Sequence, residues 1–219
     1  MTSAERFSDT SCEPAVRGFL HDGGAHGLVI THGAGGNAQS GLLQALAECF
    51  SVSDFVVLRA ELPFRQLRPY GPPRPGDGSR DRAGLKNAVA MLRKLTSGPV
   101  FLGGQSYGGR QASLLLAEEP VADGLLLLSY PLHAPSRPDQ LRIDHLPQIQ
   151  VPTLWVHGTR DPFGSIQELE KAQKLIPART SLMVIEGAGH DLGFKGKAKR
   201  AELPDKVLSK FREFFATTS

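Results

Sequence analysis

Ser106 is the residue whose setting could best support chemistry. Residues 104–108 read Gly-Gln-Ser-Tyr-Gly, with an apolar run before them at 99–102 and a helical pattern after them at 110–119. A serine between a buried strand and a helix lies on a sharp turn that exposes its hydroxyl, and the flanking glycines let the strand and helix approach without a Cβ clash. The pattern therefore predicts a nucleophilic serine, although five residues alone could match by chance in a chain with 24 glycines.

A serine hydroxyl becomes a good nucleophile when a base takes its proton, and that base is commonly a histidine oriented by a carboxylate. Asp161 follows an apolar run at 153–157, and His190 follows another at 181–186. Both residues come directly after predicted strands, as Ser106 does. We therefore predict His190 as the base and Asp161 as the residue that orients it, although Asp161-Pro162 would also suit an ordinary turn.

A reacting carbonyl also needs two main-chain N–H groups to hold its developing negative charge. Tyr107 follows the serine at the start of a helix, where the helix dipole favours an anion. The second donor is expected in the loop at 31–37, which reads Thr-His-Gly-Ala-Gly-Gly-Asn. Ala34 is the first choice and Gly35 the second.

The elements that must position these residues alternate between short apolar runs and helical patterns. This alternation is typical of an α/β fold, a mostly parallel sheet of about six to seven strands with helices on both faces. Sites in such sheets lie at the carboxyl ends of the strands. We expect strands at 27–31, 54–59, 99–103, 124–129, 153–157 and 181–186, an antiparallel edge strand at 15–20, and helices at 41–50, 85–95, 110–119, 166–175 and 206–215.

The length and composition favour one domain at 15–219, preceded by a flexible leader at 1–14. Proline and arginine fill the segment 62–82, which we interpret as a connector, as we do 131–151. Neither connector is long enough for a large lid. The 25 basic and 22 acidic residues are interspersed and leave a net charge of only +3, so the sequence does not favour nucleic acid as a partner.

Cys12 and Cys49 are too few for a disulfide framework or a metal cluster, and such usage fits a reducing compartment. The first dozen residues lack an apolar stretch, so no signal peptide is expected. The longest apolar run, at 125–128, is far too short to span a membrane. We predict a cytoplasmic protein, a monomer or homodimer, with no membrane partner.

Four motifs in order now resemble the α/β-hydrolase superfamily: His-Gly-Ala-Gly-Gly at 32–36, Gly-Gln-Ser-Tyr-Gly-Gly at 104–109, His-Gly-Thr-Arg-Asp-Pro at 157–162 and Gly-Ala-Gly-His at 187–190. The resemblance covers roughly residues 25 to 217 and is to its small, lidless, dienelactone-hydrolase-like branch. Within it, the chain looks like bacterial proteins of predicted hydrolase type and their testis-expressed and chromatin-complex relatives in animals. True dienelactone hydrolases use a cysteine nucleophile, whereas this chain has Ser106.

The resemblance implies a serine hydrolase that cleaves a small carboxylic ester or thioester through an acyl-enzyme, with a small acyl substrate and neither metal nor cofactor. An acyltransferase using the same triad and a catalytically silent scaffold are the alternatives. Some hydrolases of this fold carry the acid one strand earlier, so Asp139 and Asp144 remain rivals of Asp161. Asp191, beside His190, is expected to be solvated.

Three further residues are candidates for contact with the substrate. His133 follows the strand predicted at 124–129 and could line a pocket. Arg59 and Arg65 flank the strand end nearest the predicted site and could clamp an anionic group, because guanidinium binds carboxylates through two hydrogen bonds. His32 and His157 are instead expected to order their own loop and to fill the core, respectively.

Overall fold

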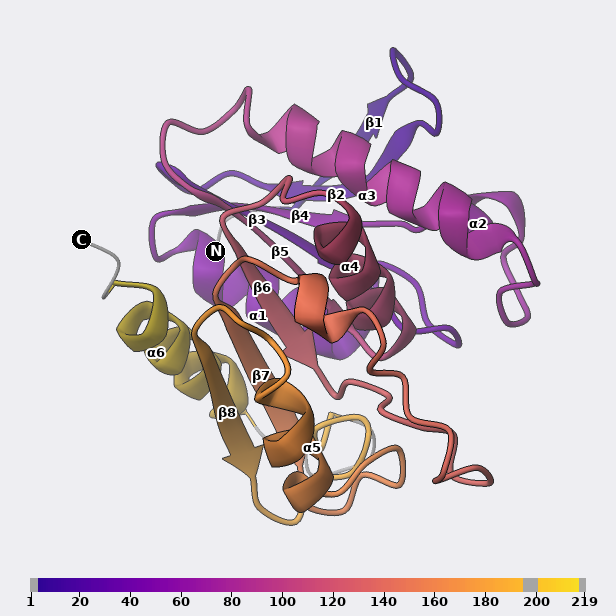
Figure 1. Cartoon of the computed structure of the whole chain (residues 1–219). Coiled ribbons are helices and arrows are strands. Elements are labelled where there is room, and N and C mark those ends of the chain that lie inside the picture. Colours follow the sequence, from indigo (N-terminus) through magenta and orange to yellow (C-terminus); the bar gives the residue numbers. More distant parts are fainter. Residues whose placement is uncertain (1–3, 195–200, 217–219) are drawn as a thin grey trace.

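The computed structural model describes residues 4–194 and 201–216, and its centre is an eight-stranded sheet (Figure 1). The spatial order is β1-β2-β4-β3-β5-β6-β7-β8. The pairs from β4 to β8 are parallel, and β1 and β2 join antiparallel at one edge. The strands are β1 (Glu5–Asp9), β2 (Val16–His21), β3 (His26–Thr31), β4 (Phe55–Ala60), β5 (Val100–Gln105), β6 (Gly124–Leu128), β7 (Thr153–Gly158) and β8 (Thr180–Ile185).

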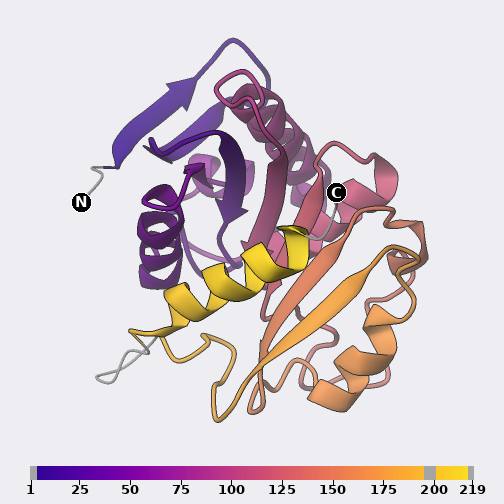
Figure 2. The ribbon, with the colours of Figure 1, turned by 90° about the vertical axis from the view of Figure 1, so that its left-hand side faces the viewer.

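Two helical layers cover the sheet. One face packs against α1 (Gly41–Ser51) and α6 (Leu203–Ala216), and the other against α3 (Asp77–Leu92), α4 (Tyr107–Glu118) and α5 (Ile166–Gln173) (Figures 1 and 2). Neighbouring residues of β3 go to opposite layers, which is why its sequence is a continuous apolar run. The predicted α/β fold with a mostly parallel sheet is confirmed.

The predicted flexible leader at 1–14 is wrong for residues 5–9. These residues form β1, which pairs antiparallel with β2 from Glu5 opposite Leu20 to Asp9 opposite Val16. Phe7 packs against the core from the middle of the strand. A five-residue strand with a single apolar side chain gives little periodicity, so the pairing with β2 is what stabilises it. The sheet thus has one strand more than expected, and β1 takes the edge predicted for 15–20.

The two connectors hold short helices and no large lid. The first contains α2 (Pro63–Leu67), with proline in the first helical turn, where its missing N–H removes no hydrogen bond. It ends at Asp77, where α3 begins eight residues before the predicted start at 85. The second contains the 3-10 turn η1 (Leu146–Gln148). None of the described helices combines the length and apolar character needed to cross a bilayer.

Candidate active site

Ser106 occupies the turn between β5 and α4. Its backbone has φ 51° and ψ −117°, a conformation that costs a non-glycine residue roughly 1–3 kcal/mol. The Ser106 N–H donates to the carbonyl of Leu128 on β6 at 2.8 Å, and the Ser106 carbonyl accepts from the N–H of Arg110 at 2.9 Å. The neighbouring strand and the first helical turn therefore hold the turn in place.

Two glycines make this turn possible. A Cβ atom added to Gly104 would lie 2.6 Å from the carbonyl carbon of Gly108, and one added to Gly108 would lie 2.5 Å from the carbonyl oxygen of His32. Real Cβ atoms do not approach other atoms so closely. The strand, the helix and the 32–37 loop can therefore meet around Ser106 only with glycine at both positions.

Ser106, His190 and Asp161 form one hydrogen-bonded chain. The Ser106 Oγ lies 2.8 Å from His190 Nε2, and His190 Nδ1 lies 2.8 Å and 3.0 Å from the two carboxylate oxygens of Asp161. The Asp161 side chain is fully buried, whereas that of His190 is 28% exposed. The structure thus brings together three side chains that the sequence separates by up to 84 positions.

Contacts around the carboxylate hold it in position. Asp161 Oδ1 accepts the N–H of Phe163 at 2.9 Å, and His157 Nε2 lies 3.5 Å from Oδ2. Burial is the main cause that lowers the pKa of His157, which favours its neutral imidazole. The ring of Phe163 stacks on that of His190 with centroids 4.2 Å apart. Phe163 thus contacts both partners of the pair.

Two loops carry the acid and the histidine, and main-chain hydrogen bonds join them. Arg160 N–H donates to the carbonyl of Ala188 at 2.9 Å, and Gly187 N–H donates to Thr159 Oγ1 at 2.8 Å. The loop after β7 therefore fixes the loop after β8. These hydrogen bonds hold Asp161 and His190 next to each other at the carboxyl ends of neighbouring strands.

The alternative acids lie elsewhere. Asp139 and Asp144 are exposed on the connector between β6 and β7, whereas Asp161 supplies the carboxylate that His190 contacts. Asp191 Oδ1 accepts the N–H of Gly193 within its own turn. Of the four carboxylates considered from the sequence, Asp161 is the one placed against the imidazole.

The 32–37 loop lies against the serine. A Cβ atom added to Gly33 would lie 3.3 Å from the Cβ of Ser106. His32 is fully buried, with Nδ1 2.9 Å from the Gly33 carbonyl and Nε2 accepting the N–H of Leu62 at 3.2 Å. Its ring therefore orders the loop, as the sequence predicts.

Arg65 is also part of this loop's support, and the prediction that it clamps substrate is wrong. Its side chain donates to four main-chain carbonyls: Gly36 at 2.9 Å, Ala34 at 2.8 Å, Gly71 at 3.0 Å and Arg68 at 3.2 Å. The residue is only 7% exposed. Its donors are thus used to join the 32–37 loop to the segment after α2.

The same prediction is wrong for Arg59. This residue is 4% exposed, and its guanidinium donates to His21 Nε2 at 2.9 Å and to the Ala38 carbonyl at 2.7 Å while lying over the ring of Phe19. Strand β4 is covered on both faces, so a side chain from its end points into protein rather than solvent. Arg59 therefore stabilises the sheet edge.

His133 does not contact the three central residues. Its Nδ1 lies 3.0 Å from the Ala134 carbonyl, its Nε2 lies 3.6 Å from a carboxylate oxygen of Glu168, and its side chain is 8% exposed. Its main-chain N–H donates to the carbonyl of Phe163. His133 thus supports the segment that carries Phe163, and both ring nitrogens already have protein partners.

Asp81 is a residue at this site that the sequence analysis missed. It is fully buried, accepts the hydroxyl of Tyr107 at 2.7 Å through Oδ2 and the N–H of Phe64 at 2.9 Å through Oδ1. Burial is the main cause that raises its pKa. One feature of the sequence could have indicated its burial. Asp81 lies four residues before Leu85, so it shares the buried face of the helix if the helix begins before residue 81.

Two grooves border the loops and the helix that adjoin Ser106 in sequence or in space. One, of about 440 Å³, borders the 32–37 loop, Arg65 and residues 69–72. The other, of about 540 Å³, runs from residues 73–79 to Arg82 and the first turns of α4; we call it the α4 groove. The proline-rich connector thus lines both grooves.

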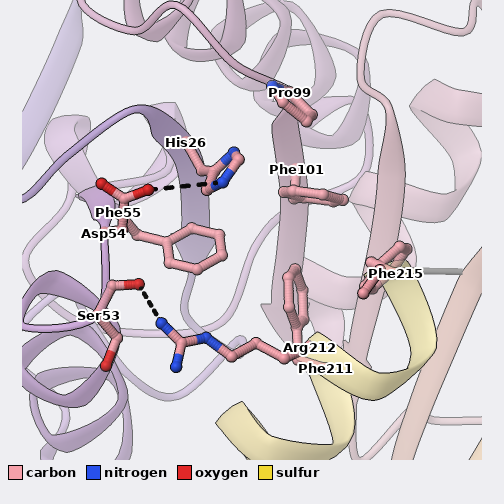
Figure 3. Close-up of a pocket in the computed structure, with 10 residues that line it drawn as sticks. His26, Ser53, Asp54, Phe55, Pro99, Phe101, Phe211, Arg212 and Phe215 are labelled. Carbon is pink, nitrogen blue, oxygen red and sulfur yellow. Dashed lines mark hydrogen bonds and ion pairs between the residues drawn. The ribbon is translucent and has the colours of Figure 1, made fainter. Parts of the chain in front are cut away.

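A third hollow, of about 310 Å³, lies at the other end of the strands (Figure 3). His26 and Phe55 begin β3 and β4 there, and the phenylalanines of α6 form its wall. Two of its polar side chains have partners: Arg212 donates to the Ser53 carbonyl, and His26 Nε2 pairs with Asp54. This hollow is remote from Ser106, which follows the carboxyl end of β5.

Comparison with solved structures shows the same fold in proteins of low sequence identity. A dienelactone hydrolase from Anabaena variabilis is 23% identical, with a TM-score of 0.73 over 98% of this chain and 97% of that one. Est1E from Butyrivibrio proteoclasticus is 19% identical, with a TM-score of 0.73 over 98% and 99%. XC6422 from Xanthomonas campestris, described as a serine hydrolase without a lid, is 14% identical, with a TM-score of 0.73 over 100% and 98%.

The sequence profile of a family described as an alpha/beta hydrolase domain matches residues 24–216. This range includes every strand of the parallel part of the sheet and all the residues around Ser106. The chain therefore belongs to the alpha/beta hydrolase family, and it is similar to its dienelactone-hydrolase-like, lidless members.

Proposed function

We propose that the protein is a serine hydrolase that cleaves a small carboxylic ester or thioester through an acyl-enzyme. The observation that carries the proposal is the chain of hydrogen bonds from Ser106 Oγ through His190 to the buried carboxylate of Asp161. A nucleophile, a base and a residue that orients the base are the groups that acyl transfer through serine requires. The hydrolases and esterase among its structural neighbours support the same reaction class.

In the first step, Ser106 Oγ attacks the carbonyl carbon while His190 Nε2 takes its proton. The Asp161 carboxylate accepts the Nδ1–H of His190, which selects the tautomer with a free Nε2 and stabilises the imidazolium that forms. The imidazolium then gives its proton to the leaving alcohol or thiol as the carbonyl re-forms. Ser106 is left carrying the acyl group.

The main-chain N–H groups of Tyr107 and Ala34 are the proposed donors to the tetrahedral oxyanion. Tyr107 begins α4, so its N–H is free of an intrahelical partner, and the helix dipole adds to it. Arg65 holds the Ala34 carbonyl, which fixes the orientation of this part of the loop. A water molecule deprotonated by His190 then attacks the acyl-enzyme and releases the acid.

A fluorophosphonate probe tests the nucleophile. Wild-type protein should become labelled, Ser106→Ala should not, and Ser136→Ala, which changes an exposed serine of the β6–β7 connector, should label as wild type does. Labelling of Ser106→Ala equal to that of wild type would contradict the assignment. The probe reports on the serine before any substrate is known.

A panel of p-nitrophenyl esters of increasing chain length, with thioesters and lactones, then tests the substrate class. Without a large lid the site gives long acyl chains little apolar cover, so short chains should be preferred. Best activity on long-chain lipids would contradict this expectation. Product analysis in the presence of added amines or alcohols separates hydrolysis from acyl transfer.

A further inference from the structure

The α4 groove begins beside the proposed nucleophile. Tyr107, Arg110, Gln111 and Leu114 line it from α4, which is the face that starts directly after Ser106. The N–H of Arg110 donates to the carbonyl of Ser106 at 2.9 Å, so Arg110 lies one helical turn beyond the serine. Helical side chains lean toward the amino end of their helix, and the Arg110 side chain hydrogen-bonds with Tyr130, two residues beyond the Leu128 carbonyl that accepts the Ser106 N–H.

Arg110 is a cation whose charge has no carboxylate partner within residues 4–194 and 201–216. Its Nε atom is buried and has no hydrogen-bond partner among the residues described. In the same groove, Arg82 pairs with Glu118 at 3.0 Å, and Arg74 lies next to the carboxylate of Asp77, which accepts its main-chain N–H. The Arg110 side chain has a hydroxyl partner in Tyr130 and no anionic partner among the described residues.

The groups nearest the Arg110 charge include a neutral histidine and a second arginine. Burial, and then the charge of Arg110, lower the pKa of His145 to about 4, so this histidine is neutral at pH 7. Burial, and then the same charge, lower the pKa of Arg142. His145 Nε2 lies 2.8 Å from Ser113 Oγ, one turn further along α4. The carboxylates nearby already have partners in the protein, because Asp77 pairs with Arg68 and Asp81 accepts two hydrogen bonds, so the charge of Arg110 is available to a bound anion.

We propose that Arg110 and the α4 groove bind a carboxylate or phosphate carried by the substrate, so that the preferred ester or thioester is anionic. The inference rests on the proposed function, because it places this group one helical turn from the reacting carbonyl. A planar guanidinium matches the two oxygens of such a group with parallel hydrogen bonds. The groove of about 540 Å³ has room for a short acyl chain between the carbonyl and the anion.

The decisive measurement is the ratio of kcat/KM for p-nitrophenyl hydrogen glutarate to that for p-nitrophenyl valerate, two esters of similar length that differ in charge. Wild type should favour the glutarate ester, and added salt should weaken that preference. Arg110→Gln should lower the ratio about 10- to 100-fold, the scale of a hydrogen bond to a charged group. Arg110→Lys should retain more of it than Arg110→Gln.

Arg80→Gln is the matched control, because it removes the same charge from an exposed position of α3 that pairs with Glu13. It should leave the ratio as in wild type. An Arg110→Gln protein that is folded by circular dichroism and keeps the wild-type ratio would overturn the inference. So would a wild-type protein that prefers the valerate ester.

Binding separates this inference from the proposed function. Glutarate should bind Ser106→Ala in calorimetry and should bind at least tenfold more weakly to the double variant Ser106→Ala, Arg110→Gln. Binding that depends on Arg110 supports the anion site even if no ester is hydrolysed. Turnover through Ser106 without glutarate binding would instead leave the proposed function standing and overturn the anion site.

Discussion

The hydroxyl of Tyr107 donates a 2.7 Å hydrogen bond to the buried carboxylate of Asp81. The other oxygen of that carboxylate accepts the N–H of Phe64, in the first turn of α2. One side chain of α3 therefore joins the residue after the proposed nucleophile to the helix that carries Arg65. The proposed oxyanion donors, Tyr107 and Ala34, are linked through this set of contacts.

Replacing Asp81 by alanine should destabilise the protein. Two buried donors, the Tyr107 hydroxyl and the Phe64 N–H, would lose their acceptor, which costs about 1–3 kcal/mol. Urea unfolding measures the loss in free energy of unfolding. Asp139→Ala, at an exposed position, should change stability little. An Asp81→Ala protein as stable as wild type would show that these two hydrogen bonds do not stabilise the fold.

Arg65→Met should lower kcat about 100-fold while leaving KM close to that of wild type. The variant removes four hydrogen bonds to main-chain carbonyls, two of them in the 32–37 loop, and so frees the amide that must meet the oxyanion. Steady-state kinetics on a short ester measures the two constants. Arg137→Met, at an exposed site, is the control. A rise in KM with unchanged kcat would instead indicate a role in ground-state binding.

Asp161→Asn should reduce kcat by about 10⁴-fold. The amide nitrogen of asparagine favours the wrong histidine tautomer, so Nε2 can no longer accept the proton of Ser106. Single-turnover kinetics with a p-nitrophenyl ester measures the effect. Asp144→Asn, at the position of an alternative acid, should retain wild-type activity. The reverse pattern would move the acid to the earlier loop.

Ser106→Gly should be more stable than Ser106→Ala, although both lack the nucleophile. At φ 51° glycine is unstrained and alanine is not, so the difference should be about 1 kcal/mol. Thermal unfolding followed by circular dichroism measures it. Equal stability of the two variants would show that this turn relaxes to an unstrained conformation when the hydroxyl is absent.

His21 should make stability depend on pH under acidic conditions. Burial, and then the charge of Arg59, lower the pKa of His21 to about 4, because its Nε2 accepts the Nε–H of Arg59. Its unfolded value is about 6.5. Between these values the unfolded chain binds more protons at this site, so stability falls as the pH drops, by up to about 1.4 kcal/mol per pH unit.

Urea unfolding at several pH values between 4.5 and 7.5 measures this slope. His21→Gln keeps an acceptor for Arg59 without a titrating group, so its stability should change less over the same range. A slope equal to that of wild type would mean that other groups account for the acid sensitivity.

The positions of Ser106, Asp161 and His190 could be predicted because their signals are local. Each follows an apolar strand, and parallel strands end at the same edge of a sheet. The hydrogen-bond distances between them and the burial of Asp161 could not be predicted. Both depend on tertiary contacts such as the stacking of the Phe163 ring on that of His190. The strand order likewise required pairing that no single segment encodes.

The arginines were misassigned for a physical reason. Arginine is usually exposed, so Arg59 and Arg65 are expected from the sequence to reach substrate. In the structure both are buried, and both donate to main-chain carbonyls that lie far away in sequence. The burial of Asp81 could not be predicted, because the prolines and arginines before residue 85 are typical of a connector rather than of the first turns of a helix. The sequence predicts that Arg110 begins a helix, and its separation of one helical turn from Ser106 follows from helical spacing alone.

The segment at 69–76 has a consequence for how the protein could acquire new specificity. Residues 69–72 border one groove and residues 73–76 the other. Four prolines limit its backbone freedom, so one short stretch of chain shapes part of each groove. For a substrate that occupied both grooves, variation in this segment would shift the preferences for its two halves together, whereas variation along α4 would alter one of them alone.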